Sequence, residues 1–437
     1  MTRGSDYSPD RRTALVLCGT GADGAYHAGV LKALQEAGVK IDVMAGHGVG
    51  AAAAALAAVD GASRLWSEKG IWREGAARSL YQLKLSVRLA AWFAGLLTVA
   101  VLATLLLALG DGGPPRWLVF AALALAGAIL IVLVGAAVER RAPVRRFAGA
   151  RPWWRVLGAP LDGAPASSAF ANALWELLHG GGPVARPTPA SVGRRYAEVL
   201  AESVGQPGFR ELMIVATDLD SRRDVVAALL REPFRREFVA PRAGEERQSE
   251  IIDLAGTGRD HAVDVIAAAL TPPVACDPHL VTFGVDTYWR GETHRLCDRP
   301  GACTRLLEEL ADAQVTQAIL VSAVAAPHVP HRLAAARLEP RHRLGEFLAA
   351  AQSASLRDAR LTASLRFDSV HVISPAHNAI GPFDLSGAYD EASDRWTDLS
   401  ELMNRGYEDA YRQFIEPVVG ASGEQMAHGP VEIDVRG

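Results

Sequence analysis

The chain has 437 residues and a formal charge of −4, from 45 Lys and Arg against 49 Asp and Glu, so nothing in its charge indicates a nucleic acid partner. Hydrophobic residues make up 49% of the sequence and the mean hydropathy is +0.10, which excludes a disordered chain and indicates a membrane segment. The four cysteines form no C-x-x-C pair, so neither a disulfide framework nor a structural zinc site is expected, and no metal or cofactor is predicted.

The chain begins with twelve polar residues that are expected to be mobile and that contain no apolar core, so no secretory signal peptide is predicted. A short apolar run, 13–17, then predicts a strand, followed by the glycine-rich turn 18–24 and a helix pattern over 25–37. Residues 41–45 predict a second strand, which leads into Gly46-His47-Gly48-Val49-Gly50 and an alanine-rich helix over 51–59. This strand–turn–helix unit, used twice, predicts an α/β fold with a parallel sheet.

The first turn, Gly19-Thr20-Gly21-Ala22-Asp23-Gly24, leaves two functions open. Its G-x-G-x-x-G spacing is that of a dinucleotide-binding loop, whose N–H groups hold a pyrophosphate. The same geometry stabilises the oxyanion of a tetrahedral intermediate. A dinucleotide site needs an acidic residue at the end of the second strand, whereas Asp42 stands at its start, so the oxyanion interpretation is favoured.

Two long apolar stretches predict a transmembrane hairpin within the segment 83–146. Each span, about 89–109 and 117–138, is long enough to cross a bilayer, and the turn between them contains glycine and proline. Positive charge flanks the outer ends of the pair, which predicts that the globular parts face the cytoplasm, in an integral membrane protein that we expect in a bacterial inner membrane. A bilayer is therefore the expected partner of residues 89–138.

Apart from this hairpin, the chain predicts one domain in two parts, 13–82 and 147–420, followed by a tail over 421–437. Further strands are expected over 212–217, 280–285, 319–324 and 370–374, and a helix over 191–203. A final amphipathic helix is expected over 399–415, and the charged stretch 231–250 is expected to be a solvated face.

The second turn, 46–50, has the flanking glycines of G-x-S-x-G, the sharp strand-to-helix bend that presents a nucleophilic serine. Its central residue is Gly48, which has no oxygen with which to attack an ester. The neighbouring His47 is expected to point elsewhere, in a surface or packing role.

These turns and their surroundings resemble the patatin-like phospholipase family, whose Ser–Asp dyad cleaves lipid acyl esters. The resemblance implies a three-layer α/β domain, an oxyanion loop of pattern G-G-G-x-R-G at 19–24, the G-x-S-x-G bend at 46–50 and a D-G-G or D-G-A motif that falls at Asp298. The stretches 212–220, 267–273 and 319–324 and the closing GYEDAYRQFIEP also fit this family.

The chain departs from the family pattern in each of the three motifs that matter for the reaction. Gly48 replaces the serine, Thr20 and Asp23 replace a glycine and the arginine of the loop, and only Asp298 remains of D-G-G. An aspartate at a helix N-terminus opposes an oxyanion. The favoured hypothesis is a catalytically impaired homologue that binds a membrane lipid or acyl chain or acts as a scaffold. The alternatives are an active hydrolase with a non-standard nucleophile and a nucleotide-binding, membrane-linked domain.

Overall fold

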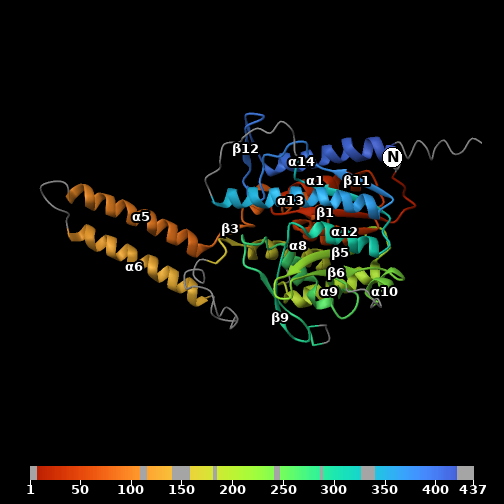
Figure 1. Ribbon diagram of the computed structural model, residues 1–437, viewed down its shortest axis with the longest axis horizontal. Coiled ribbons are helices and arrows are strands. Elements are labelled where there is room, and N and C mark those ends of the chain that lie inside the picture. Colours follow the sequence, from red (N-terminus) through yellow and green to blue (C-terminus); the bar gives the residue numbers. More distant parts are fainter. Residues whose placement is uncertain are drawn as a thin grey trace, which may run out of the picture. The chain divides into compact units, whose positions relative to one another are not determined.

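The computed structural model describes residues 7–108, 116–139, 158–180, 185–240, 247–285, 289–325 and 340–420 (Figure 1). The chain divides into two units. The larger is an α/β unit made of Met1–Tyr81, Gly163–Pro273 and Pro278–Gly437, and the smaller combines Gln82–Asp162 with Val274–Asp277. The predicted tail, 421–437, lies outside the described residues.

A nine-stranded sheet forms the centre of the α/β unit. Seven strands follow the order β11-β10-β1-β2-β5-β6-β7, while β9 pairs with β5 and β8 pairs with β9. Their bounds are β1 (Thr13–Gly19), β2 (Val43–Gly48), β5 (Glu211–Asp218), β6 (Arg223–Leu229), β7 (Ser249–Asp253), β8 (His279–Thr282), β9 (Thr293–Cys297), β10 (Gln317–Ser322) and β11 (Ser369–Ile373). The five strands from β11 to β5 run parallel to one another, which confirms the predicted α/β class with a mostly parallel sheet.

Helices cover both faces of this sheet and complete three layers. The helices of the unit are α1 (Asp23–Glu36), α2 (Val49–Ala58), α3 (Ser63–Trp66), α4 (Glu74–Ala77), α8 (Ala164–His179), α9 (Pro189–Ser203), α10 (Phe234–Val239), α11 (Ala262–Ala269), α12 (Ala302–Asp312), α13 (Pro340–Arg366) and α14 (Leu399–Ala410). Alternate residues of β1, β2, β5 and β10 pack with α12 and α13 in one core cluster. The helices α1, α2 and α11 contact the same strands. On β1 the buried residues Leu15 and Leu17 alternate with the residues of that cluster, so they face the other side of the sheet.

The last helix packs closely on the first. A Cβ on Gly29 of α1 would lie 1.8 Å from the carbonyl oxygen of Met403, and one on Gly406 of α14 would lie 2.3 Å from that of Tyr26. The Tyr26 hydroxyl donates to Asp409 at 3.0 Å. A π-helical segment, Tyr411–Val419, continues α14, so the predicted terminal helix exists but changes its winding after Ala410.

The charged stretch after residue 230, expected to be a solvated face, is mostly exposed over 231–240 and contains α10. The structure differs from the sequence predictions in two other regions. Of the N-terminal segment expected to be mobile, Tyr7 and Arg12 are buried, because Tyr7 packs on Phe414 and Arg12 pairs with Glu211 at 2.7 Å. Helix α13 was not predicted, because its many polar residues give no clear apolar stripe in the sequence.

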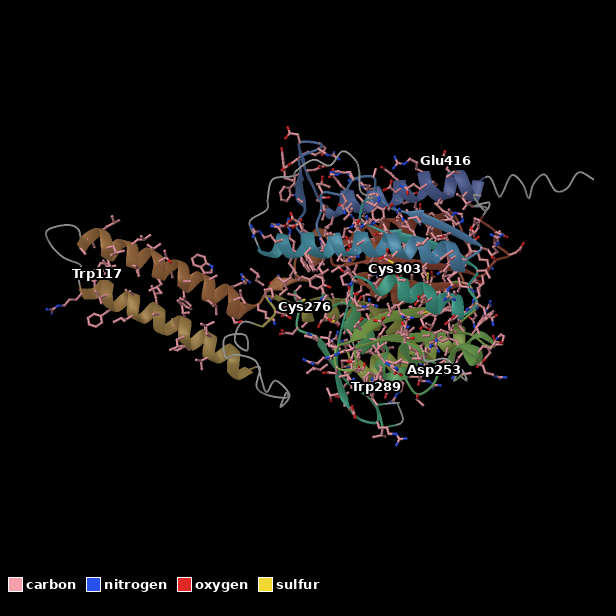
Figure 2. The ribbon with its side chains drawn as sticks, viewed as in Figure 1. Trp117, Asp253, Cys276, Trp289, Cys303 and Glu416 are labelled. Atoms are coloured by element: carbon pink, nitrogen blue, oxygen red, sulfur yellow. The ribbon has the colours of Figure 1, made fainter. Side chains whose placement is uncertain are left out.

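The smaller unit contains two long apolar helices, α5 (Leu85–Ala108) and α6 (Arg116–Glu139), which contact each other. A short pairing of β3 (Gln82–Leu83) with β4 (Leu161–Asp162) accompanies them. By length and composition, α5 over its whole length and α6 over Arg116–Val134 are apolar enough to cross a membrane, and only 6% of each apolar window is buried. Figure 2 shows side chains projecting outward from both helices, including the labelled Trp117.

Candidate functional site

The second glycine turn is a sharp bend between β2 and α2. Gly48 ends the strand and caps the helix with φ +59° and ψ −137°, a conformation that favours glycine. A Cβ at this position would lie 2.0 Å from the carbonyl oxygen of Gly19 and 3.0 Å from Oδ2 of Asp298. The bend therefore lies directly against the first glycine turn and against Asp298.

The flanking glycines of the bend are required by packing. A Cβ on Gly46 would lie 2.4 Å from the backbone carbonyl of Gly50, and one on Gly50 would lie 2.0 Å from the carbonyl oxygen of Leu17. The chain can turn from strand to helix this tightly only because neither position carries a side chain.

Asp298 follows β9 and is completely buried. Its backbone N–H donates to the carbonyl of Thr271 at 3.0 Å. Its carboxylate oxygens have separate partners: Oδ1 lies 3.2 Å from Nδ1 of His47, and Oδ2 accepts a bond of 3.3 Å from the Thr20 hydroxyl. The structure thus brings Gly48 and Asp298 together with His47 and Thr20.

His47 does not have the surface position that was one of its two predicted roles. Its side chain is buried and pairs with Asp298. Burial alone lowers the pKa of His47, but the charge of Asp298 and the hydrogen bond to it outweigh this effect, so the pKa is raised above its ordinary value. The sheet brings the two residues together, because β5 pairs with β2 near its start and with β9, which precedes Asp298, at its end.

Two N–H groups of the first glycine turn already have acceptors within the protein. The Thr20 N–H donates to the Asp23 carboxylate at 2.8 Å, and the Ala22 N–H donates to the carbonyl of Pro382 at 2.8 Å. Burial raises the pKa of Asp23 to about 7, although its bond from Thr20 opposes the shift. Gly21 adopts φ +59°, and a Cβ there would lie 2.0 Å from the Pro382 oxygen. A Cβ on Gly24, the last glycine of the turn, would meet the ring of Trp72 at 2.0 Å.

Sequence reasoning missed one polar residue of this site. Gln352, buried on α13, donates from Nε2 to the Thr20 hydroxyl at 2.8 Å, and this hydroxyl in turn donates to Asp298. No motif marks Gln352, since 332 residues separate it from Thr20. The result is a buried chain of hydrogen bonds from α13 through the first turn to Asp298.

Two thiols lie beside the same residues. Sγ of Cys18, at the end of β1, is 3.0 Å from Sγ of Cys303 on α12, which is labelled in Figure 2. Both cysteines are buried and free. The hydrogen bond with Cys303, together with burial, raises the pKa of the Cys18 thiol. The same hydrogen bond lowers the pKa of the Cys303 thiol. Both cysteines belong to the buried core cluster between the sheet and α12.

A cavity of 410 Å³ lies at the other end of the strands. The cavity is lined by the segment before β2, which includes Lys40 and Asp42, by the segment 204–211 at the start of β5, and by Arg231. It is separate from the bend at Gly48, which lies at the carboxyl end of β2.

The three-layer fold, the glycine-flanked bend and the buried aspartate beside it define an α/β protein of the lipid acyl hydrolase class. The family model described as patatin-like phospholipase matches residues 15–329, and the chain belongs to this family. No match was found among curated proteins. Among solved structures, the chain is similar to VipD from Legionella pneumophila, with 12% identity and a TM-score of 0.32, over 93% of this chain and 66% of VipD.

Proposed function

We propose that this protein is a membrane-anchored patatin-like domain that has lost Ser–Asp acyl-ester hydrolysis and that binds a membrane lipid or acts as a scaffold. In this proposal Gly48 stands at the position of the lost nucleophile, and Asp298 is what remains of the dyad. Without a side-chain oxygen at the bend, no acyl-enzyme forms there, and binding effects alone accelerate a reaction little.

The observation that carries the proposal is the position of the Gly19 carbonyl oxygen. A Cβ on residue 48 would lie only 2.0 Å from this oxygen, which is far inside van der Waals contact. The chain therefore lacks a nucleophilic side chain at this position. In addition, the backbone fills the space that such a side chain would need. An oxygen that carries partial negative charge also repels the oxyanion that an ester would form at this place.

The hydrogen bonds of the first turn support the same conclusion. An oxyanion hole needs N–H groups that are free to bind developing charge. Those of Thr20 and Ala22 already donate to Asp23 and Pro382. Since a pyrophosphate needs the same donors, this arrangement also speaks against the nucleotide-binding alternative.

The test is acyl-ester turnover by the purified full chain in detergent and in lipid nanodiscs, together with labelling by a serine-directed fluorophosphonate. We expect no labelling at 46–50 and no turnover above that of Asp298→Asn. Asp253→Asn, which removes a partly buried charge paired with Arg235, controls for general destabilisation. Saturable turnover that Asp298→Asn abolishes and Asp253→Asn preserves would overturn the proposal.

Membrane anchoring through α5 and α6 is tested separately. Positive residues outside the two helices predict that both ends of the pair stay in the cytoplasm. We expect the expressed chain to remain in the membrane fraction after washing with alkaline carbonate, which releases peripheral proteins. Release of the full chain by this wash would refute the anchor and leave the statement about lost hydrolysis intact.

A further inference from the structure

Cys18 and Cys303 are two free thiols in contact beside the candidate site. Their Sγ atoms are 3.0 Å apart, so a shift of about 1 Å brings them to the length of a disulfide. Cys18 immediately precedes Gly19 of the first glycine turn. Cys303, labelled in Figure 2, is the second residue of α12 and follows Asp298 closely in the chain. The pair therefore joins two of the segments that meet at the bend.

The two thiols hold their protons differently. The hydrogen bond from Cys18 lowers the pKa of Cys303, burial opposes this shift, and the charge of His47 adds to it. The same hydrogen bond, burial and the charge of Asp298 all raise the pKa of Cys18. Cys303 also stands in the first turn of α12, where the helix dipole favours a negative charge. Cys303 is therefore the thiolate of the pair, and Cys18 is its proton donor.

Burial restricts the oxidants that can reach the pair. Cys18 is 6% exposed and Cys303 is 2% exposed. A large disulfide such as glutathione disulfide needs an accessible thiolate, because the attacking sulfur must approach the S–S bond directly. Hydrogen peroxide is little larger than water and oxidises thiolates, so it is the oxidant of suitable size.

We propose that Cys303 and Cys18 are a peroxide-reactive pair, in which Cys303 attacks hydrogen peroxide and Cys18 resolves the product to a disulfide. The Cys303 thiolate bonds to one peroxide oxygen, the O–O bond breaks, and the leaving hydroxide takes up a proton to become water. The Cys18 thiol then attacks the sulfenic sulfur, the S–O bond breaks, and the thiol proton leaves with the hydroxide as a second water. The two sulfurs lose two electrons in total, and one peroxide is reduced to two waters.

The disulfide would join residues 285 positions apart in the chain. Closing so long a loop restricts the unfolded chain, so the oxidised protein should melt about 5 °C or more above the reduced one. Because Cys18 is adjacent to Gly19, the bond also holds the first glycine turn in place. Hydrogen exchange over 19–24 should therefore slow on oxidation, whereas exchange in α9 should not change.

The experiment treats the reduced full chain, folded in detergent micelles, with hydrogen peroxide. The chain is then unfolded in iodoacetamide, digested and analysed by mass spectrometry. We expect a linked peptide that contains Cys18 and Cys303, formed at least about tenfold faster than any oxidation of Cys276 or Cys297. These two are matched controls, because they are also buried and burial raises the pKa of each to about 12. Glutathione disulfide should react much more slowly, and dithiothreitol should restore both thiols.

Single variants separate the two roles. Cys18→Ser keeps a hydroxyl donor beside Cys303 but cannot form the disulfide, so Cys303 should accumulate as a sulfenic acid that dimedone traps on unfolding. In Cys303→Ser, Cys18 should remain a thiol. Cys276→Ser is the control and should form the disulfide as the parent does.

Four results would overturn the proposal. One is the absence of the linked peptide from the folded, peroxide-treated parent, including its appearance only in urea. Another is oxidation of all four cysteines at similar rates. The third is equally fast oxidation of Cys18 in Cys303→Ser, which would reverse the roles. The fourth is a linked protein whose Tm and exchange over 19–24 match those of the reduced form. Each measurement is independent of acyl-ester turnover.

Discussion

Nδ1 of His47 lies 3.2 Å from Oδ1 of Asp298, and both side chains are buried. In the proposed function Asp298 is what remains of a catalytic dyad, and it faces an imidazole from the residue before Gly48. A buried charge is costly unless another group compensates for it. His47 supplies that compensation and holds the end of β2 against the segment after β9.

The pair predicts a pH-dependent effect of Asp298→Asn. Because the pKa of His47 is raised in the folded state, the pair stabilises the protein fully below the unfolded histidine pKa of about 6.5, and this stability is lost as the pH rises through the folded pKa. We expect Asp298→Asn to lower the Tm much more near pH 6 than near pH 9. Melting curves of the two proteins across this range check it, and an equal loss at every pH would contradict it.

Asp23→Asn should raise the Tm, whereas Asp298→Asn should lower it. The pKa of Asp23 is raised to about 7 in the folded protein by burial, so its ionisation makes folding less favourable as the pH rises from about 4 to about 7. Asparagine keeps the acceptor for the Thr20 N–H without the charge. The variant should therefore melt at a higher temperature than the parent above pH 7.

The control for this prediction is Asp220→Asn. The hydrogen bond from Arg295 lowers the pKa of Asp220, so its stabilising effect is present above the unfolded value and is lost in acid. At neutral pH, Asp220→Asn should lower the Tm while Asp23→Asn raises it. A fall in Tm for both variants would show that Asp23 is ionised without cost.

Gly48→Ser alone should not restore a reactive serine. A side chain at φ +59° is strained, and its Cβ would meet the Gly19 carbonyl oxygen, so we expect a loss of stability of at least about 1–3 kcal/mol. Gly48→Ala should cost the same, because the Cβ causes the conflict. Urea unfolding and fluorophosphonate labelling check this. Strong labelling of Gly48→Ser at parental stability would show that the Gly19 carbonyl can move away.

Thr20→Val should weaken the link between α13 and Asp298. Valine keeps the shape of threonine but cannot accept from Gln352 or donate to Asp298, so polar groups at both ends lose a partner at a cost of about 1–3 kcal/mol. Thr20→Ser keeps the hydroxyl and should cost less. Hydrogen exchange around Gln352 should rise in Thr20→Val only; equal exchange in both variants would mean that the hydroxyl does not hold α13.

The parts of the site that sequence reasoning found are those with local patterns. The glycine spacings at 19–24 and 46–50 and the strands before them are visible because each depends on neighbours in the chain. The contacts of Cys18 with Cys303 and of Thr20 with Gln352 join residues 285 and 332 positions apart, and no local pattern specifies them. The orientation of His47 depends on its contact with Asp298, which is 251 positions away in the chain.

The close approach of α1 and α14, at Gly29 against Met403 and at Gly406 against Tyr26, shows how far the folded domain extends. The family model ends at residue 329, yet α1 at the start of the chain has its backbone in contact with α14, seventy residues or more beyond that limit. A chain cut at the family boundary would expose the seam on α1 where these backbones meet. Expression of the α/β unit alone must therefore include the residues through at least the end of α14 to give a soluble product.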